Sequence, residues 1–164
     1  MATVTIKVID KDGTDVDQTV QSDPPMSDHP VQGQKDTPAQ DAARFVTFLF
    51  RSGRKGQMGP IKGWLGIDPS MEPDREARAE VTITLEDTGR NDYHVKFESN
   101  PPLFQGEPWI DGIPENPQSV WLQTPSVAQM VGSALAKMIL KNAAMLKSGE
   151  ATASPPQPTQ DPQE

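Results

Sequence analysis

Cysteine is absent from the 164-residue chain, which excludes disulfides, thiolate metal sites and cysteine nucleophiles. Aromatic residues make up only 5% of it. No run of about 18 apolar residues occurs, because polar residues such as Gln129, Ser133 and Lys137 interrupt the most apolar segment, 127–146. No basic region or apolar region precedes the first alternating segment, so we expect no secretory signal and no membrane span. We therefore expect a cytoplasmic protein, or a virion component if the gene is phage-encoded.

Basic residues are the minority charge, with 15 Lys and Arg against 23 Asp and Glu and a net charge of −8. Nucleic-acid-binding proteins gain affinity by neutralising phosphates with basic side chains, and anionic membranes attract basic surfaces. The balance argues against both partners. The 34% of hydrophobic residues, diluted by 17 prolines, is a thin but sufficient supply of core formers. We therefore expect a single domain over 1–149, and the strand and helix signals described below make it α+β. Residues 150–164 have no core former larger than alanine, which predicts a disordered, proline-rich tail.

Two segments alternate apolar and polar residues with a period of two, which predicts half-buried strands. The first, Thr3 to Ile9, turns at Asp12-Gly13 and continues as a weaker strand over 15–21. The second forms a hairpin about Gly89. The apolar pairs expected in that hairpin are Val81 with Phe97, Ile83 with Val95, and Leu85 with Tyr93.

Helix-start signals occur twice, at Thr37-Pro38 and at Thr124-Pro125. The first predicts a helix to about residue 52, with Ala42, Phe45, Val46 and Leu49 on one face. A buried strand over Phe45–Phe50 is the alternative, because short apolar runs are ambiguous. The second predicts a helix to about residue 147. Segments 53–78 and 100–123 are expected to be connections, the latter with a short strand at 119–122.

A gapless offset of 77 residues superposes the two hairpins in sequence. Val4-Thr5-Ile6 falls on Val81-Thr82-Ile83, and Asp10 falls on Asp87. The Ser-x-Pro-Pro that follows each hairpin also coincides, and a loop longer by ten residues then brings the two Thr-Pro pairs together. We interpret this as a duplicated ββα unit, at 3–52 and 79–147 with a linker at 53–78. The expected fold is an antiparallel sheet of two hairpins packed with two helices, related by a pseudo-twofold axis; chance similarity of two hairpins is the alternative.

Four carboxylates cluster near the first turn, where oxygen ligands could hold calcium: Asp10, Asp12, Asp15 and Asp17. An EF-hand loop has glycine sixth and glutamate twelfth, and this segment has neither. Asp-Gly is also a common hairpin turn. We therefore favour the turn over the metal site, and expect no cofactor.

A basic segment stands out against the acidic background, formed by Arg51, Arg54, Lys55 and, further on, Lys62. Glycines beside these residues would let backbone amides approach an anion, although no Gly-Lys-Ser/Thr of a Walker motif occurs. A solvated helix end is the simpler interpretation. The segment offers an anion or nucleic-acid site as an alternative.

The three tryptophans, Trp64, Trp109 and Trp121, fall in segments expected to be connections. Tryptophan is enriched at interaction hot spots, so these loops are candidate docking surfaces. The competing interpretation is that they fold down as lids over a small core.

Catalytic signals are lacking. His29 and His94 have no recognisable partner, and no spacing selects an acid–base pair from Asp68, Glu72, Glu107, Asp111 and Glu115. No G-x-S-x-G or H-E-x-x-H occurs. The sequence therefore favours a non-catalytic interaction or assembly subunit that binds a protein partner or another copy of itself. An anion- or nucleic-acid-binding module is the alternative, and an enzyme comes third.

Overall fold

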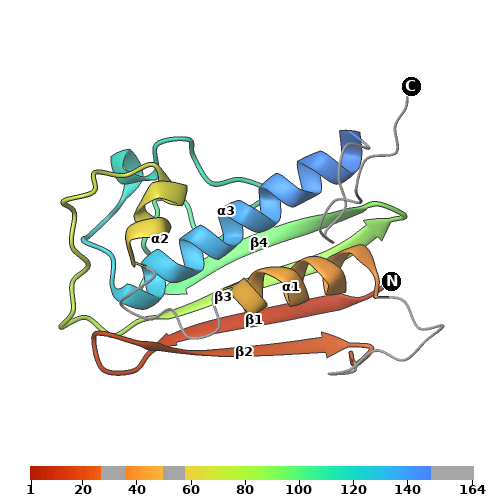
Figure 1. Ribbon diagram of the computed structural model, residues 1–164, viewed down its shortest axis with the longest axis horizontal. Helices are drawn as coiled ribbons and strands as arrows, with labels where there is room; N and C mark the ends of the chain where they lie inside the picture. The colour runs from red at the N-terminus through yellow and green to blue at the C-terminus, as the bar shows by residue number, and fades with distance from the viewer. Residues whose placement is uncertain (27–35, 50–57, 149–164) are drawn as a thin grey trace.

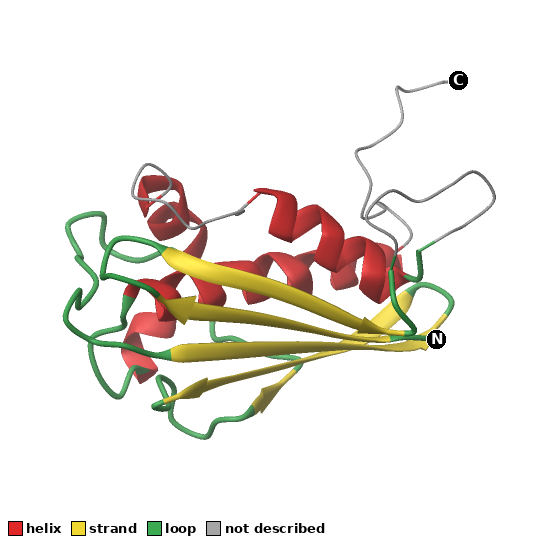
Figure 2. Ribbon diagram, turned by 90° about the horizontal axis from the view of Figure 1, so that it is seen from below, coloured by secondary structure: helices red, strands yellow, loops and turns green. Residues whose placement is uncertain are grey.

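The computed structural model describes residues 1–26, 36–49 and 58–148. The protein has an α+β fold in which the two longest helices of the described chain cover one face of a five-stranded antiparallel sheet, and a third helix packs on the longer of them (Figures 1 and 2). The strand order is β2-β1-β3-β4-β5. The strands are β1 (Thr3–Asp10), β2 (Val16–Asp23), β3 (Glu80–Gly89), β4 (Asp92–Asn100) and β5 (Trp109–Ile110). The helices are α1 (Pro38–Leu49), α2 (Met58–Leu65), α3 (Val127–Ser148) and the 3-10 helix η2 (Pro117–Val120).

Both hairpins lie in this one sheet, joined by antiparallel pairing of β1 with β3, in which Ile6 faces Ile83. The predicted alternation is confirmed, since Val4, Ile6 and Val8 are fully buried under the helices. The opposite face carries threonines and charged residues such as Lys7. No helix in the described ranges is both long and apolar enough to cross a membrane.

The predicted register of the second hairpin is wrong by two residues. Ile83 faces Phe97 and Leu85 faces Val95. The turn falls at Arg90-Asn91, and the register shifts by one residue between Asp87 and Gly89. Because side chains alternate with a period of two, a slip of two leaves the buried face unchanged.

Helix α1 replaces the alternative strand over the described part of that segment, ending at Leu49; the residues from Phe50 on lie outside the described chain. A capping box starts the helix, because the Thr37 amide donates to Gln40 Oε1 (3.0 Å) and the Gln40 amide donates to Thr37 Oγ1 (3.3 Å). Ala42 and Val46 are buried as predicted. Phe45 and Leu49, expected in the core, are each 37% exposed.

Helix α3 begins two residues later than predicted. The Ser126 amide donates to Gln129 Oε1 (3.0 Å), and the Gln129 amide donates to Ser126 Oγ (3.2 Å), so Ser126 is the cap and Thr124-Pro125 precedes the helix. The shared start signal is therefore Ser/Thr-x-x-Gln rather than Thr-Pro. Gln129 and Ser133, two of the polar residues that interrupt the apolar segment, are buried, because the first half of α3 is enclosed by the sheet, α1 and α2.

The connections also contain structure that the sequence analysis missed. Helix α2 lies within 53–78 and packs on α3 through Ile61 and Leu65, both fully buried. Gly59, Pro60 and Gly63 obscured its helical pattern, although proline is tolerated in a first turn. The strand expected at 119–122 is the end of η2 followed by a single bridge between Trp121 and Phe104.

Two buried aspartates tie the hairpins to the helices, and we call them the aspartate clamps. The Asp10 carboxylate accepts hydrogen bonds from the amides of Ala79 and Ala128, each at 2.9 Å. The Asp87 carboxylate accepts from the amides of Ala2 (2.8 Å) and Ala39 (2.9 Å). Each clamp thus joins the hairpin of one half of the chain to the first turn of the helix of the other half.

Because of Tyr93, we expect the free energy of unfolding to fall at alkaline pH. Its buried hydroxyl donates to the Ile139 carbonyl (2.8 Å) and accepts from Asn142 Nδ2 (3.0 Å), and burial raises its pKa to about 12. An unfolded tyrosine ionises near pH 10, so the folded state holds the extra proton between these values and stability falls as pH rises through the window. We expect a loss of roughly 2 kcal/mol there.

Tyr93 is the only tyrosine, so a phenolate absorbance titration reports it alone. The titration should show a midpoint well above 10, returning to about 10 in urea. Tyr93→Phe, measured by urea denaturation at pH 9 and pH 11, should lose less stability over that interval than wild type. Equal slopes would contradict the assignment.

Candidate protein-interaction site

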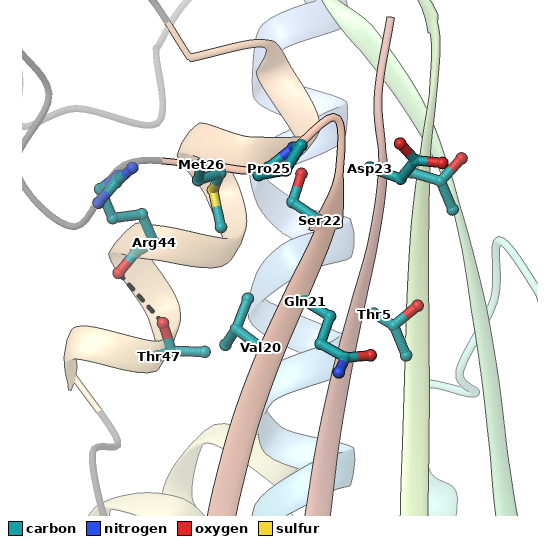
Figure 3. Close-up of a pocket in the computed structure, with 10 residues that line it drawn as sticks. Thr5, Val20, Gln21, Ser22, Asp23, Pro25, Met26, Arg44 and Thr47 are labelled. Atoms are coloured by element: carbon teal, nitrogen blue, oxygen red, sulfur yellow. Dashed lines mark hydrogen bonds between the residues drawn. The ribbon is translucent and has the colours of Figure 1, made fainter.

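A cleft of about 860 Å³ lies beside the outer edge of β2, between that strand and α1 (Figure 3). Arg44 and Thr47 of α1 line one side, and Val20 and Met26 line the part nearest the core. Thr3, Thr5, Gln21 and Asp23 line it from the open face of the sheet, so the cleft continues around the edge of β2. Ser22 and Pro25 complete the lining. The cleft therefore follows the end of an edge strand, where a further chain segment could lie.

The outer edge of β2 has no neighbouring strand in the described chain. The Asp10 amide donates to the Ala79 carbonyl, on the β3 side. Backbone N–H and C=O groups alternate in direction along a strand. Because Asp10 points to β3, the odd-numbered residues of β1, such as Thr5 and Lys7, form their hydrogen bonds with β2. Their partners Gln21 and Thr19 point back to β1. The amides and carbonyls of the residues between them, Gln18, Val20 and Ser22, therefore point outward.

The opposite edge of the sheet is covered. The Ser99 amide donates to Glu107 Oε1 (2.6 Å), and the Val95 amide donates to Asp111 Oδ1 (2.7 Å). Phe97, between them, pairs with Trp109 of β5. The outward backbone groups of β4 are thus satisfied by one short strand with a carboxylate at each end. Within the described residues, no strand pairs with those of β2.

Gln18, in the edge strand β2, has a side-chain amide that is unsatisfied within the described chain. Both polar atoms of its side-chain amide, Oε1 and Nε2, are buried and have no hydrogen-bond partner among the described residues. A buried unsatisfied polar group costs about 1–3 kcal/mol. Gln18 lies on the same face of β2 as Val20, two residues away, so this unsatisfied amide lies on the helix side of the strand.

The three predicted tryptophan anchors lie in different places, and two of them pack on the core. Trp109 in β5 stacks on Phe104 with ring centroids 4.9 Å apart and donates its Nε1–H to the Gln105 carbonyl. Trp121 is half-buried, and its buried Nε1 has no hydrogen-bond partner in the described part of the chain. Trp64 lies in α2, not in a loop, and is 43% exposed. Of the three, Trp64 has the exposure of a docking residue.

A shallow apolar depression of about 520 Å³ accompanies Trp109. It lies between Pro108 and Pro114 and includes Ile110, which is 66% exposed. Of the described proline-rich loops, this depression best matches the tryptophan-bearing docking surface that the sequence analysis predicts.

The basic segment is described only at Lys62; Arg51, Arg54 and Lys55 lie outside the described residues. The Lys62 side chain is 10% exposed, and its ammonium donates to Glu72 Oε2 (3.0 Å) and to the Pro69 carbonyl (3.1 Å). The hydrogen bond from Lys62, followed by one from Arg75, lowers the pKa of the Glu72 carboxyl. Lys62 therefore supports α2 rather than presenting a charge to an anion.

The four aspartates near the first turn have separate structural roles. Asp10 is a clamp, and Asp12 accepts from the Thr14 amide and hydroxyl and the Asp15 amide, which lowers its pKa. Asp15 accepts from the Val16 amide, and Asp17 is exposed on the open sheet face. In residues 1–26, 36–49 and 58–148, no three metal-ligating side chains gather into a site.

Sequence reasoning missed the residues that anchor β5. His94, expected to lack a partner, has its Nδ1 2.6 Å from Asp111 Oδ2. Glu107 accepts from the Ser99 amide and hydroxyl and from the amides of Leu103 and Phe104. No local pattern marks either carboxylate, because the two-residue strand that positions them has no periodicity.

No protein-family model, characterised protein or solved structure matches the chain.

Proposed function

We propose that the protein is a non-catalytic interaction module that binds a protein partner along the outer edge of β2. One observation carries the proposal: β5 and two carboxylates cover the β4 edge, while in residues 1–26, 36–49 and 58–148 no strand covers the equivalent backbone groups of β2, which border a cleft. An uncovered edge strand is a template for another strand, and proteins recognise extended segments in this way.

The anion-binding alternative has less support. The one basic residue of its segment in the described chain, Lys62, is already paired with Glu72, and the net charge of −8 opposes phosphate binding. Among the described residues, the exposed His94–Asp111 pair is the nearest approach to an acid–base constellation. It joins β4 to the residue after β5, which is a structural task, so nothing favours an enzyme over a binding module.

We also propose that the two halves arose by duplication of one ββα unit. The clamps support it, since Asp10 and Asp87 make the same bonds to residues at matching positions. The Gln40 amide nitrogen, Nε2, donates to the Pro24 carbonyl, and that of Gln129 donates to the Pro101 carbonyl. With the helices aligned at their caps, the loop between hairpin and helix is longer by twelve residues, rather than ten, in the second half. The same loop contains the segment that covers β4.

The interaction surface can be tested by affinity capture from an extract of the native source. Val20→Pro removes an outward amide of β2, whereas Val20→Thr keeps the amide and the side-chain shape. We expect a saturably bound partner to be retained by wild type and Val20→Thr and lost from Val20→Pro. Trp64→Ala should retain it.

Melting curves of all variants provide the control for folding. Loss of the partner from Trp64→Ala but not from Val20→Pro would move the contact surface to α2. If wild type retains no protein saturably, the proposed function is wrong.

A further inference from the structure

The covered edge of the sheet shows what the open edge lacks. With the hairpins aligned, Val20 of β2 corresponds to Phe97 of β4, and Ser22 corresponds to Ser99. On β4 the matching space is filled by residues 104–111 of the same chain. Phe104 packs edge-to-face on Phe97, with centroids 5.4 Å apart, and β5 then pairs with the strand.

The covering segment has three recognisable chemical features. An aromatic ring, Phe104, sits over the strand's core-side residue; a carboxylate, Glu107, binds the outward amide and hydroxyl of the serine. A second carboxylate, Asp111, binds the outward amide two pairs further along. Between the carboxylates, Trp109–Ile110 supplies the antiparallel backbone.

The edge of β2 has groups at the positions that would bind the same three features. Ser22, which takes the place of Ser99, has its amide directed outward into the cleft. Val20 is smaller than Phe97, which leaves room for an aromatic ring, and Met26 lines the same space. The outward amide of Gln18 corresponds to that of Val95, the partner of Asp111.

A second copy of the chain is a poor occupant in the register that centres the pairing on Val20. Antiparallel pairing of two β2 strands centred on Val20 would set Asp17 of one copy opposite Asp23 of the other, twice. Both are exposed, and like charges directly opposite each other destabilise a strand pair.

We propose that β2 and its cleft bind an extended segment of another protein that carries an aromatic residue followed, three and seven residues later, by carboxylates. The segment adds as an antiparallel strand to β2, with its ring over Val20, its first carboxylate on Ser22 and its second on the Gln18 amide. This inference rests on the proposed function and specifies the partner's chemistry.

The probe is a fluorescent peptide with the sequence of residues 103–112, titrated into the full chain and followed by anisotropy. We expect saturable binding that becomes at least about tenfold weaker when Glu107→Gln or Phe104→Ala is made in the peptide. Hydrogen exchange should slow at the amides of Gln18, Val20 and Ser22. Val20→Pro in the protein should abolish binding, and Val20→Thr should preserve it.

Several results would overturn the inference. They are no binding to the full chain, equal affinity for the Glu107→Gln peptide, or slowed exchange at Val95 and Ser99 instead. Sedimentation as a dimer that Val20→Pro dissociates would identify a second copy as the occupant. If Val20→Pro does not fold, the peptide variants and the exchange pattern still decide. Failure here while capture still depends on Val20 would leave the proposed function intact and reject only this peptide chemistry.

Discussion

Asp87→Asn should lower the free energy of unfolding by about 2–4 kcal/mol, and Asp10→Asn by a similar amount. Each carboxylate accepts two buried backbone hydrogen bonds, at 2.8–2.9 Å, and a bond to a charged group contributes about 1.5–3 kcal/mol. In asparagine the side-chain oxygen still accepts one of the two hydrogen bonds. The NH₂ group replaces the second oxygen, so two donors face each other and the second bond is lost. Urea denaturation at neutral pH measures the loss.

Matched controls lie on the same strands but on the open face of the sheet. Glu86→Gln beside Asp87 removes an exposed charge with no buried partner, and should change stability by less than about 0.5 kcal/mol. Because the clamps share no partner, the double variant Asp10→Asn/Asp87→Asn should lose the sum of the single losses. Losses near zero at Asp87 would mean that the carboxylate does not hold Ala2 and Ala39.

The period-two pattern was sufficient to predict the strands of both hairpins, because burying one sheet face imposes it directly on residues such as Val4 and Ile83. It did not predict the register at Gly89, since the bulge that sets it depends on turn geometry. The start of α3 was misplaced because the Thr-Pro pair resembles a start signal, whereas the Ser126–Gln129 capping box forms the actual one.

The candidate site could not be predicted in the same way. An open edge is a property of the whole sheet: it exists because β5 covers β4 and, within the described residues, nothing covers β2. Trp109 was singled out by residue type, yet its ring lies on Phe104 and contributes to the cover. Composition identifies an anchor-type side chain, but only tertiary contacts show whether its surface is already in use.

Gly132→Ala should destabilise the protein by about 1–3 kcal/mol, the usual cost of overpacking a filled core. A Cβ on Gly132 would lie 2.5 Å from Cγ1 and 2.9 Å from Cβ of Val81. Val81 is fully buried in β3, so neither it nor α3 can move without disturbing the centre of the fold. The effect opposes intrinsic propensity, because alanine favours a helix over glycine by about 1 kcal/mol.

Gly63→Ala in α2 is the matched control, since its Cβ would meet nothing within 4 Å. It should leave stability unchanged or raise it by up to about 1 kcal/mol. Val81→Ala clears the space that the new methyl group needs while leaving a cavity of its own. The double variant Gly132→Ala/Val81→Ala should therefore be more stable than the two single losses predict, a coupling that a double-mutant cycle in urea measures. Strict additivity would show that α3 does not approach β3 at Gly132 as closely as the structure places it.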